Sequence, residues 1–178
     1  MSRTSLKKEL NNLSAPQLVE IILDAYQARP EIKEYFEYFL NPDVNKLIDK
    51  HNKIIDKEYN RGKWHNSKAR VSVLNKAVKT FESFSPGNEA VIQILLREVI
   101  VAGVTENELN FADTHFNRVV KLVDRILSLS EEAGVLADSL TRLNQFVSDD
   151  YKFASRYMKR LVKDTVNNYN SNKTLTKK

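Results

Sequence analysis

The chain has 178 residues, which is long enough to build one hydrophobic core. Of these residues 42% are apolar and 29% are charged, and the formal net charge is +5. The chain contains no cysteine, which excludes disulfides, thiolate catalysis and cysteine-ligated zinc or iron–sulfur clusters. Only four glycines and four prolines interrupt the backbone, which favours long helices over the many turns of a β-sandwich.

Apolar residues at helical spacing and strong capping signals predict the helices of the first half. Leucines indicate a short helix over 4–12. Ser14-Ala15-Pro16-Gln17 reads as a capping box that opens a second helix, and Pro30 ends that helix and opens a third, which reaches residue 40. Later boundaries follow the same logic. A fourth helix is predicted from Asn41-Pro42 to Gly62, followed by a loop over 61–66 and by a fifth helix capped by Ser67.

The second half is punctuated in the same way. Asn88 is predicted to cap a sixth helix that ends at Gly103, and a second capping box over 105–108 opens a seventh. Ser130 begins an eighth helix, in which Gly134 costs roughly 1 kcal/mol relative to alanine and frays the first turn.

The last predicted helix starts at Ser148-Asp149-Asp150, with Phe153 and Tyr157 turned inward. Residues 170–178 carry no apolar stripe and are expected to form a disordered basic tail.

No segment alternates apolar and polar residues as a half-buried strand does. The sequence therefore predicts an all-α protein, a single compact array of antiparallel helical hairpins with seven to nine helices over residues 1–169. Helix starts near Pro42, Asn88 and Glu131 lie about 45 residues apart, which is a weak sign of a solenoid. The most apolar stretch, 90–104, is too short to span a bilayer, and no signal peptide is visible, so a cytoplasmic location is expected.

No catalytic or metal-binding motif accompanies these helices. His51 and His115 fall on or beside apolar stripes, and none of the three histidines has a carboxylate or a second histidine at metal-ligand spacing. Phosphate-binding glycine loops and serine nucleophile elbows are missing as well. We therefore expect a binding protein rather than an enzyme, with no catalytic residues, no metal and no cofactor.

Charge is concentrated in two segments. Residues 43–79 hold ten Lys/Arg against four Asp/Glu, and residues 151–178 hold eight against one. Such segments favour binding of an acidic protein partner. The alternative is that the protein binds a nucleic acid through segments 43–79 and 151–178. They also fit ordinary solvated helix faces. The sequence leaves the oligomeric state open.

The loop around the only tryptophan is the predicted partner-binding site. Tryptophan and arginine are enriched at protein interfaces, and an aromatic ring among cations also suits single-stranded nucleic acid. A third interpretation is that Trp64 folds back and plugs the end of a helical hairpin. The candidate residues are Arg61, Lys63, Trp64, His65, Lys68 and Arg70.

Several segments resemble an uncharacterised, all-helical bacterial family of unknown function. They are Leu6-Lys7-Lys8-Glu9-Leu10, the helix over 18–26, Glu34-Tyr35-Phe36-Glu37-Tyr38-Phe39-Leu40-Asn41-Pro42, Lys53-Ile54-Ile55-Asp56-Lys57-Glu58-Tyr59 and Arg61-Gly62-Lys63. The resemblance is clearest over roughly residues 5–80. It implies an intracellular, all-helical bacterial protein, and it supplies no activity and no catalytic residue.

Overall fold

The protein is all-helical, as the sequence predicts. A computed structural model describes residues 1–65, 68–109, 111–148 and 153–175, excluding the side chains of 62–65, 107–109 and 174–175. Within these ranges there are nine helices and no strand, and none of the helices is long and apolar enough to cross a membrane. The helices are α1 (Arg3–Leu10), α2 (Ala15–Ala28), α3 (Pro30–Leu40), α4 (Val44–His65), α5 (Val71–Ser83), α6 (Asn88–Leu109), α7 (Asp113–Glu132), α8 (Leu136–Val147) and α9 (Arg156–Leu175).

The chain divides into two compact units. Unit 1, Met1–Asp43, contains α1–α3, and unit 2, Val44–Lys178, contains α4–α9. The sequence predicts one domain over residues 1–169 and gives no sign of this division. Whether that range folds cooperatively stays a prediction. α9 is helical to Leu175, well into the segment predicted as a tail, and residues 176–178 lie outside the described part.

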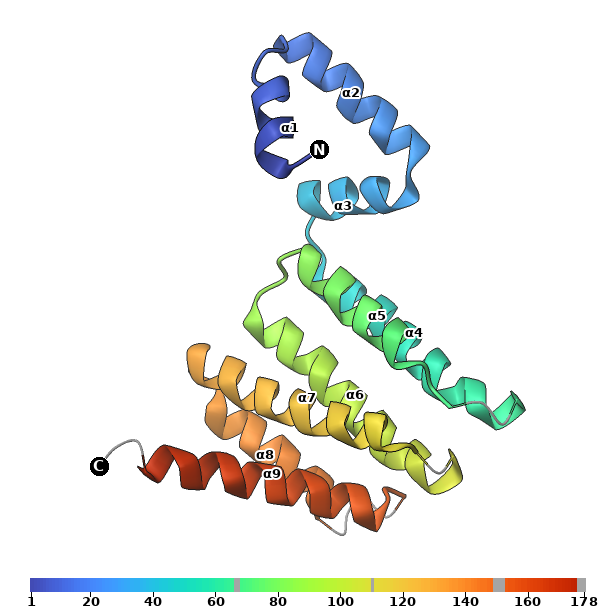
Figure 1. Ribbon diagram of the computed structural model, residues 1–178, viewed down its shortest axis with the longest axis vertical. Coiled ribbons are helices and arrows are strands. Elements are labelled where there is room, and N and C mark those ends of the chain that lie inside the picture. Colours follow the sequence, from blue (N-terminus) through green and yellow to red (C-terminus); the bar gives the residue numbers. More distant parts are fainter. Residues whose placement is uncertain (66–67, 110, 149–152, 176–178) are drawn as a thin grey trace. The chain divides into compact units, whose positions relative to one another are not determined.

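Unit 2 is built from sequential helix pairs around α6. α6 packs against both α4 and α7, and the pairs α4–α5, α6–α7 and α8–α9 lie side by side (Figure 1). Short connections join the partners of each pair, which makes them antiparallel hairpins as predicted. The interior contains large side chains that are at most 2% exposed: Tyr59, Phe81, Phe146, Ile55, Leu74, Ile94, Leu95, Ile126, Leu127, Leu143, Met158 and His51.

Two predicted boundaries in unit 1 are confirmed. Ser14 Oγ accepts the backbone N–H of Gln17, and Gln17 Oε1 accepts the backbone N–H of Ser14 at 2.9 Å, which completes the capping box. Pro30 is the first residue of α3, where its fixed φ suits a helix and its missing N–H costs nothing.

The predicted limits of the fourth helix are wrong at both ends. Asn41 instead ends α3, because its N–H donates to the carbonyl of Glu37 at 3.1 Å, and α4 begins at Val44. α4 runs through Gly62 to His65, so residues 61–65 are helix rather than loop. Ser67, the predicted cap of the next helix, lies outside the described residues. α5 begins at Val71 with Arg70 at its N-cap.

Gly103 does not end a helix, because α6 continues to Leu109. Its role is close packing, since a Cβ at this position would overlap the ring of Phe146 from α8, which is only 1% exposed. The carbonyl of Gly103 also accepts the N–H of Ser155 at 2.8 Å. Thr105, predicted as a cap, donates its hydroxyl to the Val101 carbonyl within the same helix at 2.8 Å.

Gly134 ends α7 and does not fray the start of an eighth helix. Its φ is +73°, and the N–H of Val135 donates to the Ser130 carbonyl at 2.8 Å, which is the Schellman arrangement at a helix C-terminus. Ser130, predicted to open a helix, is completely buried, and its Oγ lies 2.6 Å from Ser139 Oγ of α8.

The start of the last helix is also corrected. α9 begins at Arg156, and Ser155 Oγ accepts the N–H of Met158 at 3.4 Å, whereas Asp149 and Asp150 lie outside the described residues. Phe153 and Tyr157 were expected inward, yet they are 81% and 55% exposed. Val162 is buried, as its place on the predicted apolar stripe indicates, and Met158, rather than its neighbour Tyr157, enters the core from the first turn.

The packing of Gly103 predicts the sign of a substitution. An unobstructed Gly→Ala change inside a helix stabilises by up to about 1 kcal/mol. Here we expect Gly103→Ala to destabilise by about 1–3 kcal/mol, because the new methyl group must displace Phe146. Urea unfolding of the single variant and of Gly103→Ala in a Phe146→Leu background measures this. A smaller loss in the Leu background is expected, and a gain in stability from the single variant would refute the contact.

Candidate functional site

The predicted partner-binding residues lie where α4 leads into α5. Arg70 Nε and Nη2 donate to the two carboxylate oxygens of Glu58 at 2.9 Å each, and its backbone N–H donates to Glu58 Oε1 at 2.8 Å. Arg61 lies 3.9 Å from the same carboxylate. Two of the predicted cations therefore hold a carboxylate of their own chain.

The remaining candidates are not brought together by the described structure. Lys68 is exposed. Lys63, Trp64 and His65 lie in the last turn of α4, and their side chains lie outside the described part. The choice among an interface, a stacking platform and a plug for Trp64 stays open, and the set remains a prediction.

Glu58 fastens α4 to the start of α5. The hydrogen bond from Arg70 lowers the pKa of Glu58 below its ordinary value, although burial acts in the opposite direction. The carboxylate also stands at the N-terminus of α5, where a negative charge interacts favourably with the helix dipole. This local neutralisation reduces the positive charge that the segment offers to a partner.

A second, buried charge cluster was not anticipated from the sequence. Glu98 of α6 is 0% exposed, and Arg118 of α7 donates to it in bidentate fashion, with Nη2 2.8 Å from Oε2. Tyr59 of α4 donates its hydroxyl to Glu98 Oε1 at 3.3 Å, and Asn75 of α5 accepts from Arg118. Burial, followed by the charge of Glu98, raises the pKa of Tyr59 well above its ordinary value. Because Glu98 is inaccessible, we assign the cluster a structural role.

The two described histidines are core residues. His51 is 1% exposed, its Nδ1 lies 3.0 Å from the Leu47 carbonyl, and its ring meets Phe81 edge-on. His115 stacks on Phe111 with ring centroids 4.7 Å apart, and its Nε2 lies 2.7 Å from the Ala69 carbonyl. Within the described ranges, no group of three or more histidine, aspartate or glutamate side chains is arranged to hold a metal ion.

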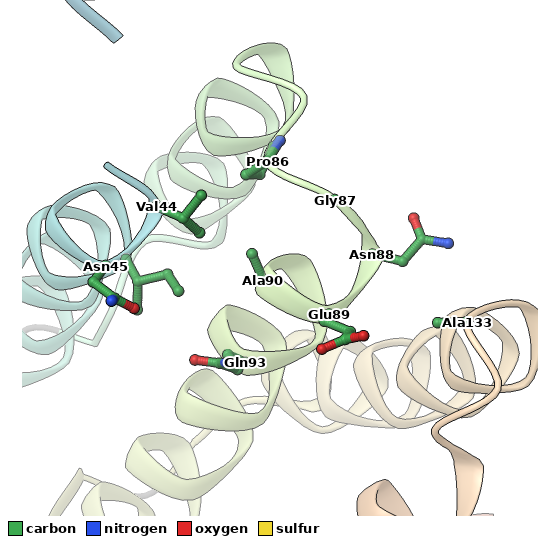
Figure 2. Close-up of a pocket in the computed structure, with 10 residues that line it drawn as sticks. Val44, Asn45, Pro86, Gly87, Asn88, Glu89, Ala90, Gln93 and Ala133 are labelled. Carbon is green, nitrogen blue, oxygen red and sulfur yellow. The ribbon is translucent and has the colours of Figure 1, made fainter. Parts of the chain in front are cut away.

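Two cavities of unit 2, with volumes of about 600 and 310 Å³, share Ile48 and Gln93 in their lining. We name their joint surface the α4–α6–α8 groove. In Figure 2, Val44 and Asn45 of α4 lie on one side of the larger cavity, and Ala90 and Gln93 of α6 lie beside them. The smaller cavity continues past Asn52, Leu96, Arg97 and Ile100 to Arg142 and Gln145 of α8.

The lining of the groove combines three kinds of side chain. Aliphatic groups such as Ile48 and Leu96 are buried and form its base. Amides occur along both cavities, at Asn45, Asn52, Asn88, Gln93 and Gln145, and each amide carries a donor and an acceptor. Two guanidinium groups lie at the end near α8. Asp56 holds Arg97 by two hydrogen bonds of 2.7 and 3.1 Å, and Arg142 lies 3.5 Å from Asp138.

A further cavity of about 430 Å³ lies between α7 and α9, with Asp124, Tyr169 and Lys173 in its lining. Tyr169 donates to Glu131 at 2.6 Å, and burial together with this carboxylate raises the pKa of Tyr169 to about 12. Burial also raises the pKa of Asp124. A phenol with so high a pKa stays protonated near neutral pH, which makes it a poor general base.

The comparison with known families gives one result. The model of a family of unknown function, DUF6155, matches residues 1–170. The chain belongs to this family. The match extends the resemblance seen in the first 80 residues over both units, so DUF6155 includes α1–α3 as well as the groove-bearing helices. No curated protein and no solved structure matches the chain.

The Glu58–Arg70 clamp predicts a dependence of stability on acid. A carboxyl whose pKa is lowered on folding stabilises the protein above its ordinary value of 4.5, and this contribution is lost as the pH falls through the lower folded value. We expect Arg70→Gln to flatten the fall in unfolding free energy between neutral pH and about pH 3. Urea unfolding at a series of pH values measures it.

Arg61→Gln is the matched control, because it removes the same kind of group at 3.9 Å from Glu58 without breaking the bidentate bond. Its profile should follow that of the wild type closely. If Arg70→Gln leaves the acid dependence unchanged, the clamp does not hold Glu58 in solution.

Proposed function

We propose that this DUF6155 protein is a non-catalytic binding domain and that its α4–α6–α8 groove takes an extended, acidic segment of another protein. The observation that supports this most directly is the continuity of the two cavities, which share Ile48 and Gln93. Together they form an elongated surface rather than an enclosed pocket. An extended peptide advances about 3.3 Å per residue and suits such a shape.

The lining matches the chemistry of a peptide in two ways. Side-chain amides can accept from a peptide N–H and donate to a peptide carbonyl, so the exposed Asn45 and Gln93 can bind a main chain without regard to its sequence. The aliphatic base takes apolar side chains. Arg142, half-exposed at the far end, offers the planar fork that binds a carboxylate.

The surface charge of α4 favours an acidic partner. Lys46, Lys50, Lys53 and Lys57 are all exposed, and their spacing of three and four residues places them on one side of the helix. A stripe of like charge increases the rate at which an oppositely charged partner arrives. The segment from Arg61 to Arg70 lies at the other end of α4 and is a separate candidate contact for the same partner.

Nucleic acid remains the alternative, because the α4 stripe belongs to the basic segment 43–79. The second basic segment supports it less well. Lys159 donates to the Ser148 carbonyl at 2.6 Å, Arg160 lies 3.7 Å from Asp164, and Lys173 pairs with Glu131. These cations of α9 are therefore engaged within the chain. We also propose that the protein functions in the bacterial cytoplasm, as expected from the sequence.

Binding of labelled homopolymers tests the proposal. Fluorescence anisotropy of the full chain with oligoglutamate, oligolysine and single-stranded oligothymidylate compares an acidic peptide, a basic peptide and a nucleic acid. We expect oligoglutamate to bind and oligolysine not to bind. Arg142→Glu should weaken oligoglutamate binding at least about tenfold, since one charge-assisted bond is worth about 1.5–3 kcal/mol.

Arg160→Glu is the matched control, because it makes the same charge change on the exposed side of α9, away from the groove lining. It should leave the affinity nearly unchanged. Absence of oligoglutamate binding, or equal losses in both variants, would overturn the assignment of the groove. Binding of oligothymidylate alone would favour the nucleic-acid alternative.

A further inference from the structure

Unit 1 exposes an unusual amount of apolar surface. None of the residues of α1, α2 or α3 is buried. Its exposed large apolar side chains include Phe39 and Leu40, which are 65% and 70% exposed. The others are Met1, Leu6, Val19, Ile21, Ile22, Leu23 and Tyr35. Isolated exposed apolar residues are common, but this many within 43 residues indicate an association surface.

The helix α2 is the source of this exposure. Leu18, Ile21, Ile22 and Ala25 occupy one side of it, and Val19, Leu23 and Tyr26 occupy the adjacent side. Both sides cannot be covered by α3 alone, which packs along α2 and receives a hydrogen bond of 3.4 Å from Tyr26 to Glu37. On α3 itself, Tyr35 and Phe39 stack with centroids 6.4 Å apart and are both exposed.

A unit of this size needs additional stabilisation. Chains of about 40 residues rarely bury enough surface to fold without a disulfide, a metal or association. The protein has no cysteine. Residues 1–43 are all described, and no metal-holding cluster is found among the described residues. Of the three means, association is the one that the apolar surface of α2 and α3 supports.

The N-terminal part of unit 1 is basic and the rest of the unit is acidic, so two copies can offer each other opposite charges. Residues 1–10 carry Arg3, Lys7 and Lys8 against Glu9, whereas residues 14–43 carry six acidic residues against Arg29 and Lys33. In a two-fold dimer, each surface contacts the equivalent surface of the other copy, so the basic α1 of one copy can meet the acidic α2–α3 of the other twice. A second copy thus supplies both apolar cover and opposite charge.

We propose that two copies of this chain associate through α1–α3, with the exposed apolar sides of α2 and α3 at the centre of the interface and the α1 cations against the acidic residues of α2. Sedimentation equilibrium of the full chain tests this. The wild type should form a dimer at micromolar concentration. Leu23→Asp should raise the dimer dissociation constant at least about a hundredfold, because it places a charge in an apolar contact.

Asn167→Asp is the matched control, since it adds the same charge at an exposed position of α9 in unit 2, outside α1–α3. It should dimerise nearly as the wild type does. Far-UV circular dichroism of both variants shows whether their helices persist. A monomeric wild type would overturn the proposal and would indicate that another surface covers unit 1. A helical Leu23→Asp variant with wild-type dimerisation would overturn it too.

A charge exchange tests the pairing itself. Lys7→Glu/Lys8→Glu and Glu20→Lys/Asp24→Lys should each weaken self-association, because each puts like charges together twice. Mixing the two variants should restore a heterodimer, in which both pairs are again opposite. Failure of the mixture to associate would overturn the pairing of α1 with α2. The groove lies wholly in unit 2, so oligoglutamate binding by Leu23→Asp should be unchanged, and either proposal can fail alone.

Discussion

The ion pair between Glu98 and Arg118 is the constraint on which the packing of unit 2 depends. The pair belongs to a hydrogen-bonded network at the junction of four helices. The members are Tyr59 of α4, Asn75 of α5, Glu98 of α6 and Arg118 of α7. A buried carboxylate is tolerated only with a partner and filled hydrogen bonds. The four helices must therefore meet in one register, in which all the members reach each other.

That register also shapes the groove. The same helix α6 that carries Glu98 inward carries Gln93, Arg97 and Ile100 to the groove. Arg97 is adjacent to Glu98 in sequence and is held by Asp56 of α4. A rotation of α6 that freed Glu98 would move the groove lining as well. Binding surface and core are thus two sides of one helix.

Much of the fold could be predicted from the sequence because helix periodicity and short connections are local properties. The Ser14 capping box and the break at Pro30 depend on residues within one turn, and both are confirmed. The role of Gly103 depends on tertiary context, whereas the role of Gly134 is local. One is fixed by a ring from another helix, and the other by a positive φ at a helix end. The contact of Gly103 has no signal within one turn, whereas a glycine such as Gly134 is a local signal for a helix C-terminus.

The candidate site was less predictable for the same reason. The amides and arginines of the groove come from three helices that are far apart in sequence, so no local motif unites them. Arg70 looked available to a partner, yet Glu58, twelve residues earlier, holds it. One signal was present. Glu98 falls at the helical spacing of the buried Leu95 and Ala102, and a charge on an apolar stripe predicts a buried counter-charge.

A double-mutant cycle on Glu98 and Arg118, measured as unfolding free energies in urea, tests this account most directly. Removing one partner strands the other, so Glu98→Leu and Arg118→Met should each cost about 3–5 kcal/mol. Glu98→Leu combined with Arg118→Met should recover most of that loss. The exposed pair Asp138–Arg142 serves as the reference and should cost under about 1 kcal/mol. Single losses as small as those of the reference pair, or losses that simply add, would contradict the central role of the buried pair.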